Sequence, residues 1–251
     1  MTRRIRLIAW VVLLAVAGFQ AYAQRYAIGP DGMSYLDLSD AITLKDWGRL
    51  LDLYWSPLYP ALIGVARLVT GAGPRTEIAV VHAVNFACFV VMLAAFEYLL
   101  ASVLRLAARV RGPVLNGPWA IAASYFFFGV LAFTMTPLEL TTPDLLSDAA
   151  MFIALGAVLR LRDSAGAGEG TRDAVVFGLA LGLGGLDKSF LIPWAVLCFA
   201  TLAFAVKRRG IREIALAAGV WLAFIVPWST ALSIKAGRPT FGDAGRLTYA
   251  W

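Results

Sequence analysis

Charged residues are scarce in this chain of 251 residues: only 15% are Asp, Glu, Lys or Arg, while 60% are hydrophobic. A soluble domain carries about 25% charged and 45–50% apolar residues. The mean hydropathy of +0.75 therefore argues against a soluble globular fold. It also excludes a disordered chain, which requires low hydrophobicity. At roughly 20 apolar residues per crossing, the sequence predicts an all-α polytopic membrane protein with about seven spans.

Cysteine and histidine are scarcer still. The two cysteines, Cys88 and Cys198, lie inside apolar runs without Cys-x-x-Cys spacing, so neither a thiolate metal site nor a disulfide framework is expected. The single histidine, His82, argues against metal sites built on several histidines. A divalent cation remains possible because it needs only oxygen ligands. No metal ligand and no other cofactor is assigned.

Basic residues outnumber acidic ones, 22 to 16. In a membrane protein, cytoplasmic loops explain this excess better than nucleic-acid binding does, because Lys and Arg in such loops set the orientation. Four basic clusters fall on one side if seven segments cross: Arg3–Arg6, Arg105–Arg111, Arg160–Arg172 and Lys207–Arg212. This pattern predicts a multi-pass protein of the cell (inner) membrane with a cytoplasmic N-terminus. Most carboxylates then lie on the external, periplasmic face.

The first span is predicted over residues 5–23 and is followed by an external loop, 24–76. In this loop apolar residues interleave with charges, which is typical of amphipathic juxtamembrane helices. The apolar stretch Pro57–Thr70 is assigned to the loop, because a crossing there would move the Arg105–Arg111 cluster outside. Ala21-Tyr22-Ala23 also resembles a signal-peptide cleavage site, but the apolar run is long for one, so an uncleaved span is favoured.

Six further spans within residues 77–234 complete a single membrane module. They are predicted at Ile78–Leu104, Trp119–Met135, Leu145–Leu161, Ala174–Leu186, Phe190–Val206 and Ile214–Ile234. Residues 235–251 form an external tail, which is expected to be truncated.

Three polar groups, far apart in the sequence, fall on the predicted external face. They are Asp31, Asp144 with Asp148 one helical turn inward, and Asp187-Lys188. Each group also has a purely structural explanation. Asp31 could be a turn residue, Asp144 could be an acid in the first turn of a helix, and Lys188 could extend its side chain to the membrane interface. Their shared position favours a site, because carboxylates are costly to bury in a membrane. A lipid-phosphate substrate would need cations for the phosphate, a carboxylate for proton transfer and an apolar slot.

The sequence resembles the N-terminal membrane module of the GT-C glycosyltransferases. Within that superfamily it is most similar to the bacterial family 39-like branch, related to protein O-mannosyltransferases and aminoarabinose lipid A transferases. The motifs that carry the resemblance are, in order, Asp31-Gly32-Met33-Ser34-Tyr35, Trp55-Ser56-Pro57-Leu58-Tyr59-Pro60, Thr142-Pro143-Asp144, Gly182-Leu183-Gly184-Gly185-Leu186-Asp187-Lys188, and Pro227-Trp228 followed by Gly237-Arg238-Pro239-Thr240-Phe241-Gly242. Many members have an acid at the position of Gly32, some have a basic residue at that of Ser34, and relatives usually continue with more spans.

The resemblance implies inverting transfer of a sugar from a polyprenyl-phosphate donor to a lipid, glycan or protein acceptor at the external face. Asp31 would be the general base, Asp144 would shape the site or hold a cation, and Lys188 would contact the donor phosphate. Tyr35, Asp148 and Tyr59 complete the candidates for substrate binding, although Tyr35 and Tyr59 also suit interfacial anchors.

Two other functions stay open at this point. A non-enzymatic carrier or transporter component for lipid-linked sugars would use the same groups. However, such proteins often show internal repeats and broken helices at the bilayer midplane. No convincing repeat is present here, and the charges lie at one face. The third possibility is an inactive fragment of a glycosyltransferase whose spans merely insert into the membrane.

Overall fold

The computed structural model describes residues 1–111, 117–164, 170–206 and 210–248. Over these ranges the protein is all-α, as predicted, and contains no strand. Four described helices are long and apolar enough to cross a membrane: α1 (Thr2–Ala23), α4 (Glu77–Arg111), α5 (Pro118–Met135) and α9 (Ile211–Ala236). Length and composition thus support a membrane protein with four candidate spans among the described residues, and the predicted seven are not confirmed. The basic residues Lys207–Arg209 and the end of the tail, 249–251, lie outside the described residues.

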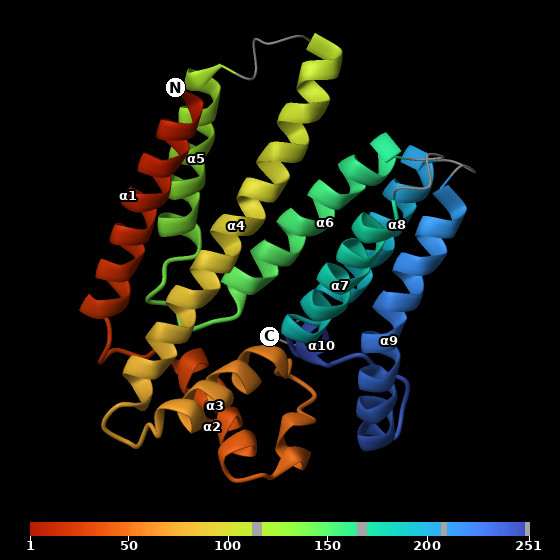
Figure 1. Cartoon of the computed structure of the whole chain (residues 1–251). Helices are drawn as coiled ribbons and strands as arrows, with labels where there is room; N and C mark the ends of the chain where they lie inside the picture. The colour runs from red at the N-terminus through yellow and green to blue at the C-terminus, as the bar shows by residue number, and fades with distance from the viewer. Residues whose placement is uncertain (112–116, 165–169, 207–209, 249–251) are drawn as a thin grey trace.

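Three further helices pack against these long ones: α6 (Asp144–Ser164), α7 (Thr171–Asp187) and α8 (Leu191–Val206). Figure 1 shows them extending along the same general direction as α4 and α9. α6 carries charges near both ends, and α7 and α8 have only 17 and 16 residues. A perpendicular helix needs roughly 20 apolar residues to span a bilayer. Because α7 and α8 are short and α6 is charged near both ends, length and composition alone do not identify these three helices as spans.

The helix ends follow local backbone chemistry. α2 (Pro30–Thr43) and α5 each begin with proline in the first turn, where its missing N–H has no intrahelical partner to lose. α3 (Leu58–Thr70) and α9 end at Gly71 and Gly237, with φ of 64° and 66°. Glycine adopts this left-handed conformation without a steric cost from Cβ.

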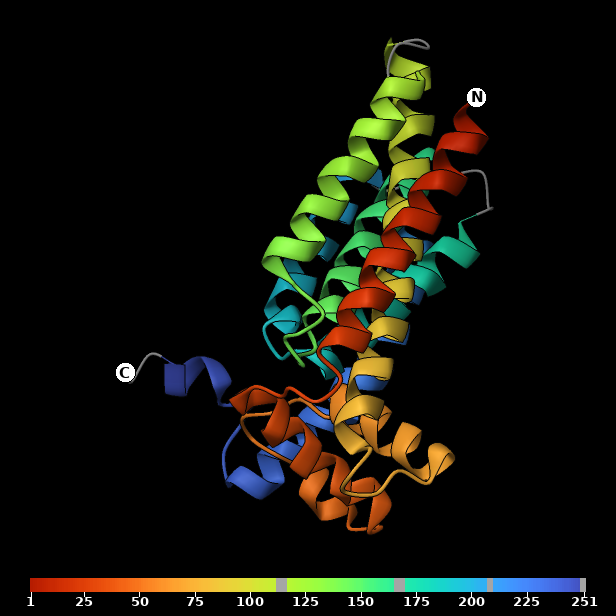
Figure 2. The same cartoon turned by 90° about the vertical axis from the view of Figure 1, so that its left-hand side faces the viewer.

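A separate layer crosses one end of the long helices. It contains α2, the short 3₁₀ helix η1 (Trp47–Leu50) and α3, and it lies at the bottom of Figures 1 and 2. α2 and α3 approach closely at Gly64, where a Cβ would lie 2.6 Å from the Cβ of Ile42. The packing therefore requires glycine at position 64, since any larger side chain would push the two helices apart.

Asn85 of α4 fixes this layer to the rest of the bundle. Its side-chain oxygen accepts a hydrogen bond from the hydroxyl of Tyr59 in α3. Its amide nitrogen donates to the carbonyls of Leu138 and Leu140, at 3.0 and 3.1 Å, in the connection between α5 and α6. Asn85 and Tyr59 are both fully buried. The buried side chain of Asn85 thus attaches both α3 and the α5–α6 connection to the same point of α4.

The core consists of two apolar clusters that meet on α6. The first joins α1, α4 and α5 with the α2–α3 layer and includes Phe89 and Leu145. The second joins α6 to α7, α8 and α9 and includes Ala154 and Phe177. α6 contributes Leu145 and Ala149 to the first and Ala154 to the second, so the two clusters adjoin near the middle of this helix.

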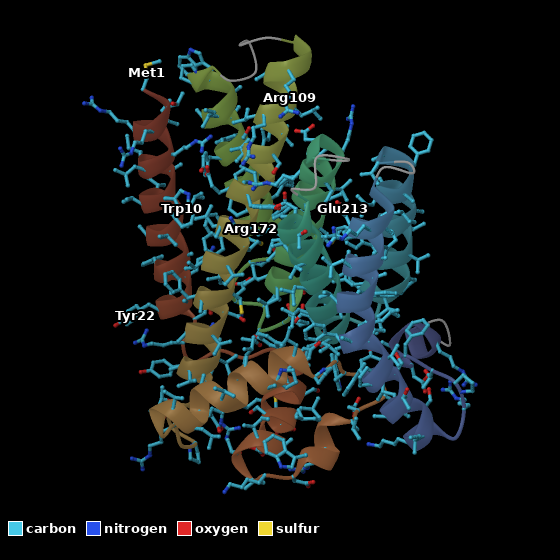
Figure 3. All side chains as sticks on the ribbon, turned by 45° about the vertical axis from the view of Figure 1, so that its right-hand side comes forward. Met1, Trp10, Tyr22, Arg109, Arg172 and Glu213 are labelled. Atoms are coloured by element: carbon cyan, nitrogen blue, oxygen red, sulfur yellow. The ribbon has the colours of Figure 1, made fainter. Side chains whose placement is uncertain are left out.

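The two ends of the helices differ in charge. Met1 and Arg109, labelled in Figure 3, lie toward the end opposite the α2–α3 layer. The helix termini at that end also carry Arg3, Arg4, Arg6, Arg105, Arg160, Arg162, Arg172 and Arg212. The positive-inside rule would assign this end to the cytoplasm and the α2–α3 layer to the external face. The orientation stays a prediction.

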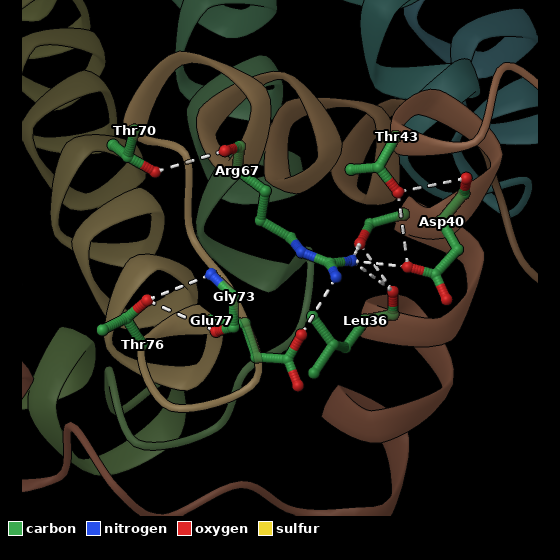
Figure 4. A network of polar contacts seen from close by, with 9 residues as sticks. Leu36, Asp40, Thr43, Arg67, Thr70, Gly73, Thr76 and Glu77 are labelled. Carbon is green, nitrogen blue, oxygen red and sulfur yellow. Dashed lines mark hydrogen bonds and ion pairs between the residues drawn. The ribbon is translucent and has the colours of Figure 1, made fainter.

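Arg67 of α3 connects the two α-helices of the layer with the start of α4 (Figure 4). Its guanidinium donates to Asp40 and Ser39 of α2, at 2.8 and 2.6 Å, and to Glu77 at the start of α4, at 2.9 Å. The Arg67 side chain is only 11% exposed, whereas Asp40 and Glu77 are 35% and 23% exposed. Removal of the arginine would leave two partly desolvated carboxylates without a cation.

We expect Arg67→Gln to loosen the α2–α3 layer. Loss of one partner from a fully buried ion pair costs about 3–5 kcal/mol, and the partial exposure here lowers the expected cost to about 2 kcal/mol. Amide hydrogen exchange in α2 and α3 should then become about 30-fold faster, while exchange in α9 should not change. Arg49→Gln is the matched control, because Arg49 and Asp46 form an exposed pair 3.9 Å apart that contributes little. Equal effects of the two substitutions would contradict the role given to Arg67.

Candidate functional site

A cavity of about 770 Å³ lies where α2, the start of α6, the junction of α7 and α8, and the C-terminal segment meet. Its polar lining includes three carboxylates, two cations and a phenol: Asp31, Asp144, Asp187, Lys188, Arg246 and Tyr35. Aromatic and apolar residues form the remaining wall, among them Tyr54, Trp55, Phe190, Pro193 and Phe241. The cavity therefore combines charged groups with an apolar surface, at the end of the bundle that carries the α2–α3 layer.

Asp144 and Lys188 form an ion pair across the cavity wall. Asp144 opens α6 directly after Pro143, and Lys188 is the residue that ends α7. Thr142 donates its hydroxyl to the second oxygen of Asp144 at 2.6 Å. Burial acts to raise the pKa of Asp144, but the hydrogen bonds from Lys188 and Thr142 outweigh it, and the pKa lies below its usual range. Asp144 is therefore a carboxylate that holds Lys188 in place.

Asp187 lies beside this pair but has a different environment. Its side chain is 1% exposed. Ser147 donates a hydrogen bond to Oδ2 at 2.7 Å, while Oδ1 has no partner among the described residues. Burial raises the pKa of Asp187 well above its ordinary value, and the hydrogen bond from Ser147 and the charge of Lys188 only partly oppose this. Burial thus favours the protonated, uncharged form of this side chain beside the ion pair.

Asp31 and Tyr35 reach the cavity from α2. Asp31 lies exposed in the first turn, where the helix dipole favours a negative charge. Tyr35, one turn later, is 5% exposed and packs edge-on against Trp55 and Tyr59, with ring centroids 4.7 and 5.1 Å away. Burial, and then the charges of nearby aspartates, raise the pKa of Tyr35 far above its usual value. Tyr35 therefore stays a phenol and presents a neutral polar group to the cavity.

Gly32 explains how α2 comes so close to the start of α6. A Cβ at this position would lie 1.7 Å from Oγ1 and 2.9 Å from Cβ of Thr141, which is 1% exposed. The acid found here in the family that the sequence resembles does not fit this contact. Gly32 thus allows the turn that carries Asp31 to lie directly against the segment that leads to Asp144.

The cavity contains most, but not all, of the predicted site residues. Asp31, Asp144, Tyr35 and Lys188 line it together. Asp148 lies instead on a second, largely apolar cavity of about 540 Å³ between α4, α5 and α6. Tyr59 has no exposed surface, since it is bonded to Asn85 and covered by Tyr35. The structure does not bring Asp148 or Tyr59 to the polar cavity, so it lends no support to substrate contact by either of them.

Sequence reasoning assigned no individual role to two residues at this site. Arg246, in the short helix α10 (Ala244–Thr248), lines the cavity from the predicted tail. Asp187 was paired with Lys188 by position, but it is buried and accepts a hydrogen bond from Ser147, 40 residues earlier in the chain. The Gly237–Gly242 motif just before α10 was the available signal for the contribution of the tail, and it pointed to no individual side chain.

A metal centre has no ligand set in the described part of the chain. No three His, Cys, Asp or Glu side chains there lie close enough together to hold an ion. Asp144, the residue suggested as a cation ligand, uses both carboxylate oxygens for Lys188 and Thr142. The divalent cation that the sequence left open remains without assigned ligands.

Comparison of the chain with protein families, with curated proteins and with solved structures finds no match.

Gly32→Ala should destabilise the protein through its contact with Thr141. Overpacking of this kind typically costs about 1–3 kcal/mol. In a Thr141→Gly background the same substitution should cost less, because the two threonine atoms are absent and only Ile28 Cγ1, 2.8 Å from the added Cβ, still opposes it. Thermal unfolding of the four proteins in detergent, followed by tryptophan fluorescence, measures both effects. An equal loss in the two backgrounds would show that the contact does not limit residue 32.

The pH dependence of stability should report the buried acid at Asp187. As the pH rises past the usual aspartate range, the unfolded chain releases this proton while the folded protein keeps it, so stability falls. Asp187→Asn mimics the neutral acid and still accepts the hydrogen bond from Ser147. We therefore expect the variant to unfold at a higher temperature than the wild type at about pH 8, with the difference vanishing near about pH 4. Identical pH profiles would mean that Asp187 is not held neutral.

Proposed function

We propose that the protein is a GT-C-like membrane glycosyltransferase, which moves a sugar from a polyprenyl-phosphate donor to an acceptor at the external (periplasmic) face. The observation that carries the proposal is the shared cavity, which combines an exposed carboxylate, Asp31, with two cations, Lys188 and Arg246. A base and a phosphate-binding pair, next to an apolar wall, are the groups that such a substrate requires. The remaining predicted spans, α6 to α8, complete a seven-span arrangement in this proposal.

Asp31 acts as the general base. The acceptor oxygen attacks the anomeric carbon of the sugar while its proton passes to the Asp31 carboxylate. The bond between that carbon and the donor phosphate oxygen breaks, and its electron pair leaves with the polyprenyl phosphate. Attack from the side opposite the leaving group inverts the configuration of the sugar. Asp31 is suited to this role because it is exposed to the cavity and has no ion pair or side-chain hydrogen bond among the described residues.

Lys188 and Arg246 bind the donor phosphate. Both line the cavity, and the ion pair with Asp144 holds the Lys188 ammonium at the wall. An ammonium has three N–H donors, so Lys188 can bond Asp144 and a phosphate oxygen at once. Asp144 is accordingly a positioning residue. Phe190 and Phe241 offer an apolar surface for the first units of the polyprenyl chain.

Asp187 and Tyr35 add neutral polar groups to the same pocket. Asp187 lines the pocket in surroundings that favour its protonated form, so it adds a carboxyl group that does not repel the donor phosphate. Tyr35 can donate its phenol to a sugar hydroxyl. A pocket with three ionised aspartates would repel a phosphate, so the neutral state of Asp187 matters for donor binding.

Asp31→Asn tests the base directly. General base catalysis contributes roughly 10²- to 10⁴-fold, so transfer should fall by about 100-fold or more. The assay uses full-length protein in vesicles, a panel of radiolabelled polyprenyl-phosphate hexoses and pentoses, and host membrane extract as acceptor. Asp37→Asn is the matched control, because Asp37 lies on the same helix, is exposed and does not line the cavity. Insertion and donor binding should be unchanged in both variants.

Two results would contradict the proposal in different ways. Wild-type transfer by Asp31→Asn would remove the base role from Asp31. Movement of labelled donor across the bilayer without any transfer would instead favour the carrier, which shares the binding step but forms no new bond.

A further inference from the structure

A second polar cavity lies at the opposite end of the bundle from the candidate site. It is an open pocket of about 360 Å³ formed by three helices, α1, α4 and α5. Its lining consists of Thr2, Arg6, Ala101, Leu104, Arg105 and Ala108, with Ile121. The cavity thus combines two arginines with small and apolar residues at the arginine-rich end of the protein.

Arg6 is held in this cavity by a network inside the bundle. One of its terminal nitrogens pairs with Glu97 of α4, and the hydroxyl of Tyr125 in α5 donates to the same carboxylate. The bond to Glu97 uses only one of the five N–H donors of the guanidinium. The Arg6 side chain is 33% exposed, so other N–H groups remain accessible. Glu97 therefore orients Arg6 without consuming its capacity to bind an anion.

Arg105 faces the same cavity from α4 and differs from its neighbour Arg109. Arg109 forms an ion pair with Asp163 at 3.2 Å. Arg105 is exposed and makes no ion pair or hydrogen bond with any described residue. Two guanidinium groups from different helices, of which one is paired with the Glu97 carboxylate, leave a net positive charge at the cavity. An anion with several oxygen acceptors matches this arrangement, because guanidinium groups bind such anions with paired N–H donors.

The surroundings indicate that the anion belongs to a lipid. An apolar groove of about 510 Å³ runs between α1 and α5 and begins beside the cavity, at Ile5 and Ala122. These positions lie next to Arg6 and Ile121 in the chain, within helices long enough to cross a bilayer. Basic pockets between membrane helices on the cytoplasmic side recognise lipid head groups. The groove can receive an acyl chain of a lipid whose head group occupies the cavity.

We propose that this cavity binds the phosphate of an anionic phospholipid, with Arg6 and Arg105 as its ligands. The site is independent of the proposed sugar transfer, because it lies at the other end of the protein and shares no residue with the first cavity. The occupied site would join α1 to α4 at the membrane surface.

Native mass spectrometry of the detergent-purified full-length protein tests the proposal. Phosphatidylglycerol should bind at least about fivefold more tightly than phosphatidylcholine, and Arg105→Gln should lower its affinity about fivefold, since a basic residue near anionic lipid contributes about 1 kcal/mol. Arg105 is exposed and unpaired, so its replacement should not impair folding; an unchanged unfolding temperature checks this. Arg3→Gln is the matched control, because it removes one charge from an exposed arginine outside the cavity.

Three outcomes would overturn the proposal. Equal binding of the two lipids would show that the head-group charge is not recognised. An equal loss in Arg3→Gln and Arg105→Gln would indicate a general surface-charge effect rather than a site. If inorganic phosphate competes with phosphatidylglycerol at equal concentration, the cavity binds a free anion and the acyl groove contributes nothing.

Discussion

A charged or polar group inside an apolar helix bundle needs a partner, and this constraint organises the whole protein. Arg67 is matched by Asp40 and Glu77, Arg6 by Glu97, and Lys188 by Asp144. Each pair connects two different helices, with partners between 10 and 91 residues apart in the sequence, so the requirement for partners also specifies which helices meet. The same requirement marks the exceptions, the free oxygen of Asp187 and the exposed guanidinium of Arg105, as places where a ligand could supply what the chain does not.

Much of the fold follows from apolar length and the few charges that interrupt it. Each predicted apolar segment between Ile78 and Ile234 forms a helix in the structure, even where it contains glycine or proline, as at Gly182 in α7 and Pro227 in α9, because an apolar segment in lipid must satisfy its backbone hydrogen bonds internally. The number of spans is less accessible from the sequence. α7 and α8 are shorter than a bilayer is thick, and how such helices cross depends on tilt and on neighbours, which composition does not encode.

The candidate site shows the same division. Asp31, Asp144 and Lys188 could be grouped from sequence because each lies at a helix end on one predicted face, and they do line one cavity. The burial of individual side chains could not be predicted from their positions at helix ends. Tyr59 was a plausible interfacial tyrosine, yet it donates a hydrogen bond to a buried asparagine 26 residues away, and the buried Asp187 accepts one from a serine 40 residues away. Such long-range partners decide whether a polar side chain faces a ligand or the core.

The contact between Gly32 and Thr141 has a consequence for how this protein can change over time. The two positions share one small volume, in which a Cβ at residue 32 would overlap the threonine hydroxyl. A larger side chain at either position must therefore be accompanied by a smaller side chain at the other. Among homologues that keep this geometry, residues 32 and 141 should covary, with glycine at one position wherever the other carries a branched side chain.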